Sequence, residues 1–447
     1  MRRPFRFASP VTRTTLSLLP LQVVARTADA SLPVIVALWF GRSPATDAYY
    51  FAWALFGLVG SLVFSAFHDS AVVPILVEVK LHAPASLPSV RGSLLVHTLA
   101  AAIAAAGAVA AVAWIWLASR YTGEVRTVAL RLVAPFSLYL VALCARTLLA
   151  SWLHAEHHYR PLPVASAAGA VVAVAVIGAL RRPLDVAAIP CGSLAGECVI
   201  VAWLAASARS AGMRLSPTIA RPEPVRRVAR LVAAEVGGGA VTRVNPLVDQ
   251  LMAGLAGVAG GGTMLKLTGD VAMVPTSLLQ AAMLPVLLTH LSDASAAGKL
   301  PQIRASVRRA LAAVIVIMAV AGALLWAVRR PLLRLVFAHG AMDPAGVERM
   351  ARILPYHLVG LAPFGALLVL ARAHVAVQNS RVMVSMGIIN AALNALLDVA
   401  LVRPLGLEGL ALATSCTSAL VALVFFVRLG PRMTAASGDR ARLELSP

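Results

Sequence analysis

Long apolar runs separated by short polar breaks fill most of the chain. In residues 46–78, Asp47 precedes a mainly apolar run of about twenty residues, the length of a membrane-spanning helix, and three polar residues, 68–70, follow. Further runs of this kind predict spans near residues 14–40, 47–75, 92–118, 127–151, 163–180, 184–207, 228–258, 264–290, 305–328, 352–374, 380–402 and 406–428. The pattern therefore predicts an all-α polytopic membrane protein with about 12 transmembrane helices.

Two halves of the chain repeat each other. AVVPIL at residues 71–76 has a near copy, AMLPVL, at residues 282–287. The stretch around Ala155 and Arg160 likewise parallels the stretch around Ala376 and Arg381. With six spans in each half, both halves start on the same side of the membrane, which predicts two parallel six-helix repeats.

Basic residues gather outside the apolar runs. This predicts a cytoplasmic N-tail (1–13), an N-terminal lobe (14–207), a cytoplasmic linker (208–227), a C-terminal lobe (228–428) and a cytoplasmic C-tail (429–447). The chain is 60% hydrophobic and 13% charged, so a soluble fold is excluded, and its net charge of +20 reflects loop arginines rather than nucleic-acid binding. We expect a multi-pass protein of the bacterial cytoplasmic membrane with both termini in the cytoplasm.

Motifs of enzymes and metal proteins are missing from the sequence. It has no phosphate-binding glycine loop, no catalytic triad and no zinc motif, and its four cysteines lack ligand spacing. We expect no enzymatic activity, no metal and no cofactor, apart from a coupling ion of unknown identity.

Charged residues interrupt several spans of the first half, among them Arg146 in the fourth span. Arg26 and Asp29 are three apart and share a helix face, so they either neutralise each other or line a wet cavity. Glu197 lies in the sixth span, where a buried acid either bonds a neighbouring helix or serves as a coupling site.

The seventh span is unusually polar. Asn245 and Asp249 share a face, while Pro246 and the preceding glycines 237–239 favour a bend or a break. Broken helices inside membranes line cavities and can bind ions. Two interpretations remain open for this span: a cation site at Asp249, or a gating kink at Pro246 that binds no ion.

Several motifs in order resemble one family of transporters. They are TDAYY from Thr46, VPIL from Val73, NPLVDQLMAGL from Asn245, AMLPVLLTHLS from Ala282, LVFAHGAMDPAG from Leu335 and GLEGLALATS from Gly406. As a set they resemble the MurJ/MviN-like lipid II flippases of the multidrug/oligosaccharidyl-lipid/polysaccharide (MOP) exporter superfamily.

The resemblance implies two lobes around a central cavity and a polyprenyl-pyrophosphate-linked glycan as substrate. It places Arg26 and Asp47 at family positions, whereas other charged positions of the family fall at Leu32, Pro33, Gly60, Asp270 and Met273. The candidate substrate-binding residues are Arg26, Asp29, Asp47, Arg243, Asn245 and Asp270, and the candidate coupling or gating residues are Asp249, Pro246 and Glu197. Membrane lipids and proteins of cell-wall or polysaccharide synthesis are the expected partners.

Three functions stay open at this point. The first is a flippase for a lipid-linked glycan, either lipid II or a polysaccharide precursor. The second is an exporter of drugs or small metabolites on the same fold, and the third is a scaffold that does not transport.

Overall fold

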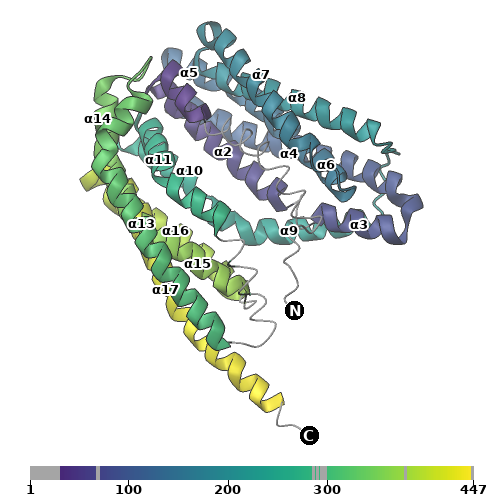
Figure 1. Cartoon of the computed structure of the whole chain (residues 1–447). Coiled ribbons are helices and arrows are strands. Elements are labelled where there is room, and N and C mark those ends of the chain that lie inside the picture. The colour runs from purple at the N-terminus through teal and green to yellow at the C-terminus, as the bar shows by residue number, and fades with distance from the viewer. Residues whose placement is uncertain are drawn as a thin grey trace, which may run out of the picture. The chain divides into compact units, whose positions relative to one another are not determined.

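The computed structural model describes residues 31–66, 71–283, 300–376 and 380–443, together with residues 287 and 291. These residues are overwhelmingly helical, and none of them lies in a strand. They belong to two compact units, Met1–Gly237 and Gly238–Pro447, called here the N-terminal and the C-terminal unit (Figure 1). The all-helical fold class expected from the apolar runs is confirmed.

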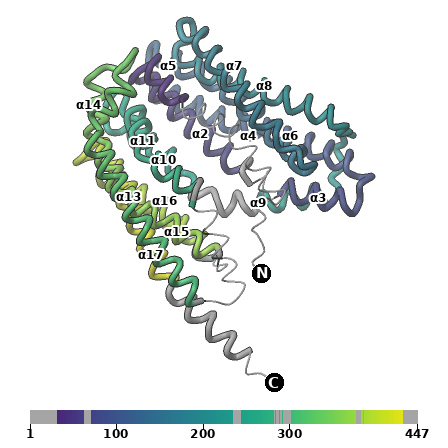
Figure 2. The backbone as a smooth tube through the Cα atoms, viewed as in Figure 1, coloured from purple at the N-terminus to yellow at the C-terminus, as the bar shows by residue number. Residues whose placement is uncertain are grey.

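The N-terminal unit begins with a short apolar helix, Ser31–Phe40. Its further helices are α2 (Pro44–Ala66), α3 (Val73–His82), η2 (Pro84–Ser86), α4 (Leu87–Arg120), α5 (Gly123–Arg131), α6 (Val133–Ala155), α7 (Pro161–Leu184), η3 (Asp185–Ala187), α8 (Ala188–Ser210) and most of α9 (Glu223–Arg243). Figure 2 follows this unit from purple into teal.

The C-terminal unit contains the end of α9 and the remaining helices. These are α10 (Asn245–Leu255), α11 (Gly261–Ala282), α13 (Leu300–Phe337), α14 (Pro344–Val359), α15 (Leu361–Ala376), α16 (Ser380–Leu405) and α17 (Leu407–Leu443). Figure 2 follows them from teal to yellow.

Six helical stretches of the described residues are long and apolar enough to cross a membrane, or seven if the pair Pro344–Val359 and Leu361–Val375, bent by 40°, forms one span. One of the six, Pro161–Ser210, contains both α7 and α8, which η3 joins without a gap. Large apolar side chains on these stretches face outwards, for example Ile115 and Leu324. The chain is thus a multi-pass membrane protein. The predicted count of twelve spans is not confirmed. The expected bounds of the lobes, the linker and the tails remain predictions.

Glycines bring α7 and α8 into close contact. A Cβ added at Gly169 would lie 2.7 Å from the carbonyl oxygen of Gly196, and one added at Gly196 would lie 2.5 Å from that of Gly169. Only glycine fits at such distances, and small residues are the usual means by which membrane helices pack without a hydrophobic driving force. This contact fixes α8, and with it Glu197, against α7.

Buried apolar residues from six helices, α3, α4, α6, α7, α8 and α9, form the core at one end of the N-terminal unit. Leu76 of α3, Leu94 of α4, Trp152 of α6, Leu204 of α8 and Val228 of α9 belong to this cluster. The cluster therefore anchors α9, although α9 carries many charges.

The seventh predicted span is two helices. α9 ends at Arg243, Val244 lies outside both helices, and α10 begins at Asn245 with Pro246 in its first turn. Proline lacks a backbone donor and is tolerated at the start of a helix, so the break falls where Pro246 starts α10. Glycines 237–239 are helical within α9.

Candidate functional site

Two of the predicted cavity residues, Arg26 and Asp29, lie outside the described residues. Asp47 lies in the first turn of α2, where an acid interacts favourably with the helix dipole. It also lies close to Tyr121, which joins α4 to α5. Burial raises the pKa of the Tyr121 hydroxyl, and the charge of Asp47 raises it further. Asp47 thus marks one end of the N-terminal unit, and its role as a substrate residue remains a prediction.

Glu197 lines a cavity inside the N-terminal unit. The cavity has a volume of about 450 Å³ and lies among residues of the short first helix, α2, α6, α7 and α8. Trp53 and Tyr139 contribute aromatic rings to its wall, and Ser166 and Ser193 contribute hydroxyls. Its size falls within the usual range for small-molecule sites.

A buried ion pair with Arg146 holds Glu197 in that cavity. Arg146 Nη1 of α6 lies 3.0 Å from Glu197 Oε2 of α8. The Glu197 side chain is only 4% exposed, whereas the Arg146 side chain is 32% exposed. The charge of Glu197 is therefore neutralised by Arg146. Because Arg146 is the more exposed of the two, its guanidinium is the charged group accessible to a molecule in the cavity.

Asp249 belongs to a different arrangement in the C-terminal unit. Asn394 Nδ2 of α16 donates one hydrogen bond to Asp249 Oδ1, at 3.0 Å, and another to Asp398 Oδ2, at 2.9 Å. A single amide thus bridges two carboxylates on two helices, and the two accepting oxygens are neighbours. Asn394 and Asp398 are four residues apart on α16, so they lie on the same helix face.

Polar atoms of this cluster remain without a hydrogen bond in the described part of the chain. They are Oδ1 of Asn394 and Oδ1 of Asp398, and Oδ1 of Asn245, at the start of α10, is in the same condition. Asn394 and Asp398 are almost fully buried, at 1% and 0% exposed. No basic side chain forms an ion pair with Asp249 or Asp398 among the described residues.

This acid–amide cluster of Asp249, Asn394 and Asp398 suits a positive charge. Two buried carboxylates repel each other unless a cation or a proton lies between them. Carboxylate and amide oxygens are ligands that hard cations prefer. The described residues contain no group of three or more histidine, cysteine or acidic side chains that could hold a metal, so a cation here would rely on amide or backbone oxygens for its other contacts.

The structure does not bring the other predicted residues of the C-terminal unit together through shared partners. Arg243 ends α9 and Asn245 opens α10, on either side of the break, with Pro246 next to Asn245. Asp270 of α11 forms an ion pair with Lys266, 2.5 Å away and one turn earlier. Asp270 is thus neutralised within its own helix, and the substrate-binding roles of these residues remain predictions.

Asn394 and Asp398 were missed as candidates from the sequence. A signal for them exists, because NALLD at residues 394–398 repeats the Asn-x-x-x-Asp spacing of NPLVD at residues 245–249. An acid inside an apolar span is itself a marker of function. Arg146 was recognised as a charge in a span, but nothing in the sequence pairs it with Glu197.

Comparisons with known proteins agree with this architecture. The family model for lipid II flippase MurJ matches residues 36–445. Two proteins described as "Probable lipid II flippase MurJ" are similar in sequence. The one from Rhizobium meliloti (strain 1021) is 25% identical over 300 residues, which cover 65% of this chain and 55% of the relative. The one from Rhizobium tropici is 23% identical over 308 residues, which cover 67% of this chain and 57% of the relative.

Solved structures extend the likeness over nearly the whole chain. A lipid II flippase MurJ in an inward closed conformation has a TM-score of 0.77 at 17% identity, covering 94% of this chain and 90% of its own. An inward-facing MATE multidrug transporter of the MOP superfamily has a TM-score of 0.73 at 12% identity, covering 92% of this chain and 95% of its own. At these identities the structures show a shared fold. With the family model matching most of its length, the chain belongs to the lipid II flippase MurJ family.

Proposed function

We propose that the chain moves a polyprenyl-pyrophosphate-linked glycan precursor across the bacterial cytoplasmic membrane. The single observation that carries this proposal is the family match over residues 36–445, and the family is one of transporters and not of enzymes. The aligned part spans little more than half the length of the curated relatives. Their activity is therefore a proposal for this chain. The cargo is a lipid II-like or a polysaccharide-like precursor, carried by alternating access.

The orientation follows from the distribution of lysine and arginine. Their excess in the expected N-tail, linker and C-tail favours both termini in the cytoplasm. A reporter fused after Arg428 should therefore be active only in the cytoplasm. Activity in the periplasm would contradict this topology.

The acid–amide cluster is proposed as the place where transport is coupled to a cation. Asp249 lies on α10, directly after the helix break, whereas Asn394 and Asp398 lie on α16. A cation bound between them links the broken helix to α16, and its release frees α10 to move relative to α16. Broken helices are used for ion coupling in other transporters.

Two experiments test the function itself. The chain should support growth of a bacterium depleted of its own lipid II flippase. The purified chain in proteoliposomes should move fluorescent lipid II from one leaflet to the other. If both fail while a polyprenyl-pyrophosphate polysaccharide precursor is moved, the cargo is a polysaccharide precursor; if neither lipid moves, the flippase assignment is wrong.

The coupling role is tested by the variant Asp249→Asn. With an imposed cation gradient, wild-type transport should accelerate, and Asp249→Asn should abolish that acceleration while substrate binding in detergent survives. The matched control is Glu348→Gln, which removes an acid of the same unit whose partners are Arg330 and Arg334 at the surface. If Asp249→Asn keeps full gradient dependence, the cluster is not the coupling site and the break at Pro246 acts as a hinge alone.

A further inference from the structure

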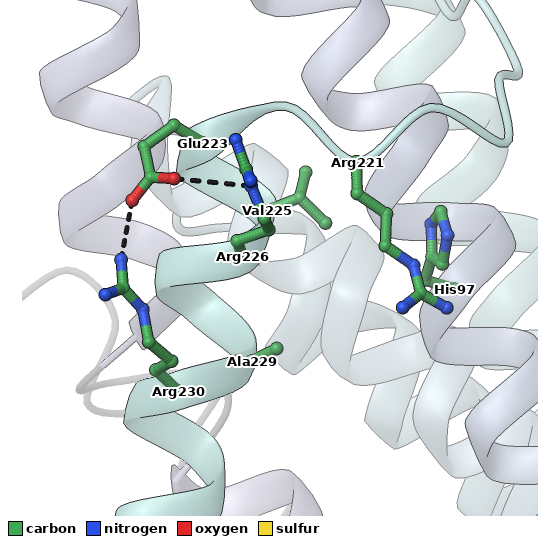
Figure 3. A pocket seen from close by; sticks show the side chains of 7 residues that line it. All are labelled: His97, Arg221, Glu223, Val225, Arg226, Ala229 and Arg230. Carbon is green, nitrogen blue, oxygen red and sulfur yellow. Dashed lines mark hydrogen bonds and ion pairs between the residues drawn. The ribbon is translucent and has the colours of Figure 1, made fainter.

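A second cavity, of about 610 Å³, lies between α4 and α9 of the N-terminal unit. Figure 3 shows its wall: His97 comes from α4, Arg221 from the segment between α8 and α9, and Arg226 and Arg230 from α9. Val225 and Ala229 give the cavity an apolar side. None of these residues belongs to the sites described above.

The charge of this α4/α9 pocket is positive. Three arginines and one acid, Glu223, line it, which leaves a net charge of +2 with His97 neutral. Glu223 already accepts ion pairs from Arg226, at 3.3 Å, and from Arg230, at 2.5 Å. These two arginines are therefore tied to one wall of the pocket.

Arg221 stands on the opposite wall, next to His97 (Figure 3). It makes no hydrogen bond or ion pair with the residues that the structure describes. Nδ1 of His97 lies 2.8 Å from the carbonyl oxygen of Ser93, which only accepts, so Nδ1 carries the hydrogen in this contact. Nε2 of a neutral His97 can then only accept a hydrogen bond, so Arg221 is the donor on this wall of the pocket.

Other basic residues nearby are already neutralised. Arg91, buried at the same end of α4, donates to Glu156 at 2.6 Å. Arg227 pairs with Glu78 at 2.9 Å. Unlike these two arginines, Arg221 has no acidic partner among the described residues, so a bound anion could balance its charge beside the cavity.

The segment that carries Arg221 is held against α4 by several contacts. The Ser216 backbone N donates to the Pro88 carbonyl oxygen at 3.1 Å, and Ser93 Oγ donates to the Ala220 carbonyl oxygen at 2.7 Å. A Cβ added at Gly92 would lie 2.0 Å from the Ser216 carbonyl oxygen. The close contact between the segment and α4 therefore requires glycine at position 92. Arg221 is therefore positioned by a fixed segment rather than by a free loop.

The pocket lies beside the start of an apolar run that is long enough to cross a membrane. The uninterrupted apolar run of α4 covers residues 99–118, about the thickness of the hydrocarbon core, and His97 lies two residues before it. Ile219, two residues before Arg221, is 83% exposed although it is strongly apolar. An exposed apolar side chain among arginines is typical of a segment that rests on an anionic membrane surface.

We propose that the α4/α9 pocket binds a phosphate ester, the chemistry that an anionic lipid head group shares with a soluble phosphate compound. Arg221 donates to the phosphate oxygens in the forked geometry of a guanidinium. Val225 and Ala229 accommodate the apolar part of the ligand. This binding does not depend on the transport function proposed above.

The test uses the full-length chain in detergent and native mass spectrometry. One arm titrates phosphatidylglycerol, with phosphatidylcholine as the zwitterionic comparison, and the other arm titrates inorganic phosphate and pyrophosphate. Arg221→Gln should weaken binding of the phosphate-bearing probe about tenfold, since a charge-assisted hydrogen bond is lost. Arg214→Gln removes the same charge from the same segment outside the pocket, and it should leave binding unchanged.

The outcomes separate the two sources of phosphate. If Arg221→Gln loses tight binding of phosphatidylglycerol but not of pyrophosphate, the ligand is a lipid head group. If it loses binding of pyrophosphate but not of phosphatidylglycerol, the ligand is a soluble phosphate ester. Gly92→Ala, which displaces the segment without changing the charge, should mimic Arg221→Gln in either case. Equal binding by wild type and Arg221→Gln in both arms, or an equal loss in Arg214→Gln, would overturn the proposal.

Discussion

In the N-terminal unit the buried carboxylate of Glu197 faces an arginine, whereas in the C-terminal unit the buried carboxylate of Asp398 shares an amide with a second acid. The first arrangement is neutral as it stands, because Arg146 lies 3.0 Å from Glu197. The second has two acids and one amide, and no ion pair among the described residues. The pair in the N-terminal unit can hold its cavity in shape without a ligand, while the C-terminal cluster is complete only with an added cation or proton.

This difference suggests a division of work between the units. An anionic cargo is best received by positive groups, such as Arg146 at the wall of the N-terminal cavity. A driving cation is best received by negative groups, such as Asp249 and Asp398.

The largest effect is expected at Arg26. Its resemblance to the family arginine of the first span makes it the proposed receiver of the substrate phosphates. Arg26→Ala should abolish transport at near-normal membrane abundance, and Arg26→Lys should restore only part of it, because a point charge cannot replace a bidentate fork. Transport assays beside membrane immunoblots check this; normal transport by Arg26→Ala would remove the phosphate-receiving role from the first span.

Next in size is the loss of the Glu197 carboxylate. Glu197→Gln leaves the half-buried Arg146 guanidinium without its acid, and breaking such a pair should cost about 2 kcal/mol, less than a fully buried pair because Arg146 is partly exposed. Thermal unfolding of the purified chain measures the loss. The double variant with Arg146→Met should recover most of it, and additive losses would mean that the two side chains are not coupled.

Removing one acid of the acid–amide cluster should have the opposite sign. In buffer without added cations, Asp398→Asn removes the repulsion between two carboxylates and should stabilise the chain by about 1–2 kcal/mol. Adding the coupling cation should stabilise the wild type more than the variant, since the variant has lost a ligand. A destabilised Asp398→Asn in cation-free buffer would show that the cluster is already complete, as the Glu197 pair is.

The fold class was readable from the sequence because apolar runs of membrane length leave few alternatives to helices. The break in the seventh span was also indicated, and it falls at Val244, next to Pro246. The triple glycine at residues 237–239 did not break the helix, because a helix in a membrane gains from keeping its backbone hydrogen bonds internal.

The partners of the buried acids could not be predicted in the same way. Arg146 and Glu197 are 51 residues apart, and Asp249 and Asn394 are 145 residues apart. Spacing on one helix says nothing about which faces of two different helices meet. The repeated Asn-x-x-x-Asp spacing marks Asn394 and Asp398 in the sequence, but only the packing of α16 against α10 shows that Asp249 is their partner.

The smallest effect is expected at Glu156, a compensated acid that lies outside the spans. It accepts from Arg91 and from Lys80. Burial alone raises the pKa of Glu156, but the hydrogen bonds and charges of Lys80 and Arg91 outweigh burial and hold the pKa below its ordinary value. A depressed pKa means that this carboxylate stabilises the folded chain above the ordinary glutamate range, and that the contribution is lost as the pH falls through the folded-state pKa.

Glu156→Gln should therefore cost about 1 kcal/mol at neutral pH, a modest loss because the network is partly open to solvent. Thermal unfolding across the acidic range should show the wild type and the variant converging as the pH falls through the lowered folded-state pKa of Glu156, below which the carboxyl group is protonated in both states of the wild type. The matched control is Glu124→Gln, an acid of the same unit in the first turn of α5. A Glu156→Gln loss that stays constant down to the lowest pH would mean that the variant disturbs packing and not charge, and Glu156 would then fall outside the class of compensated acids to which Glu197 belongs.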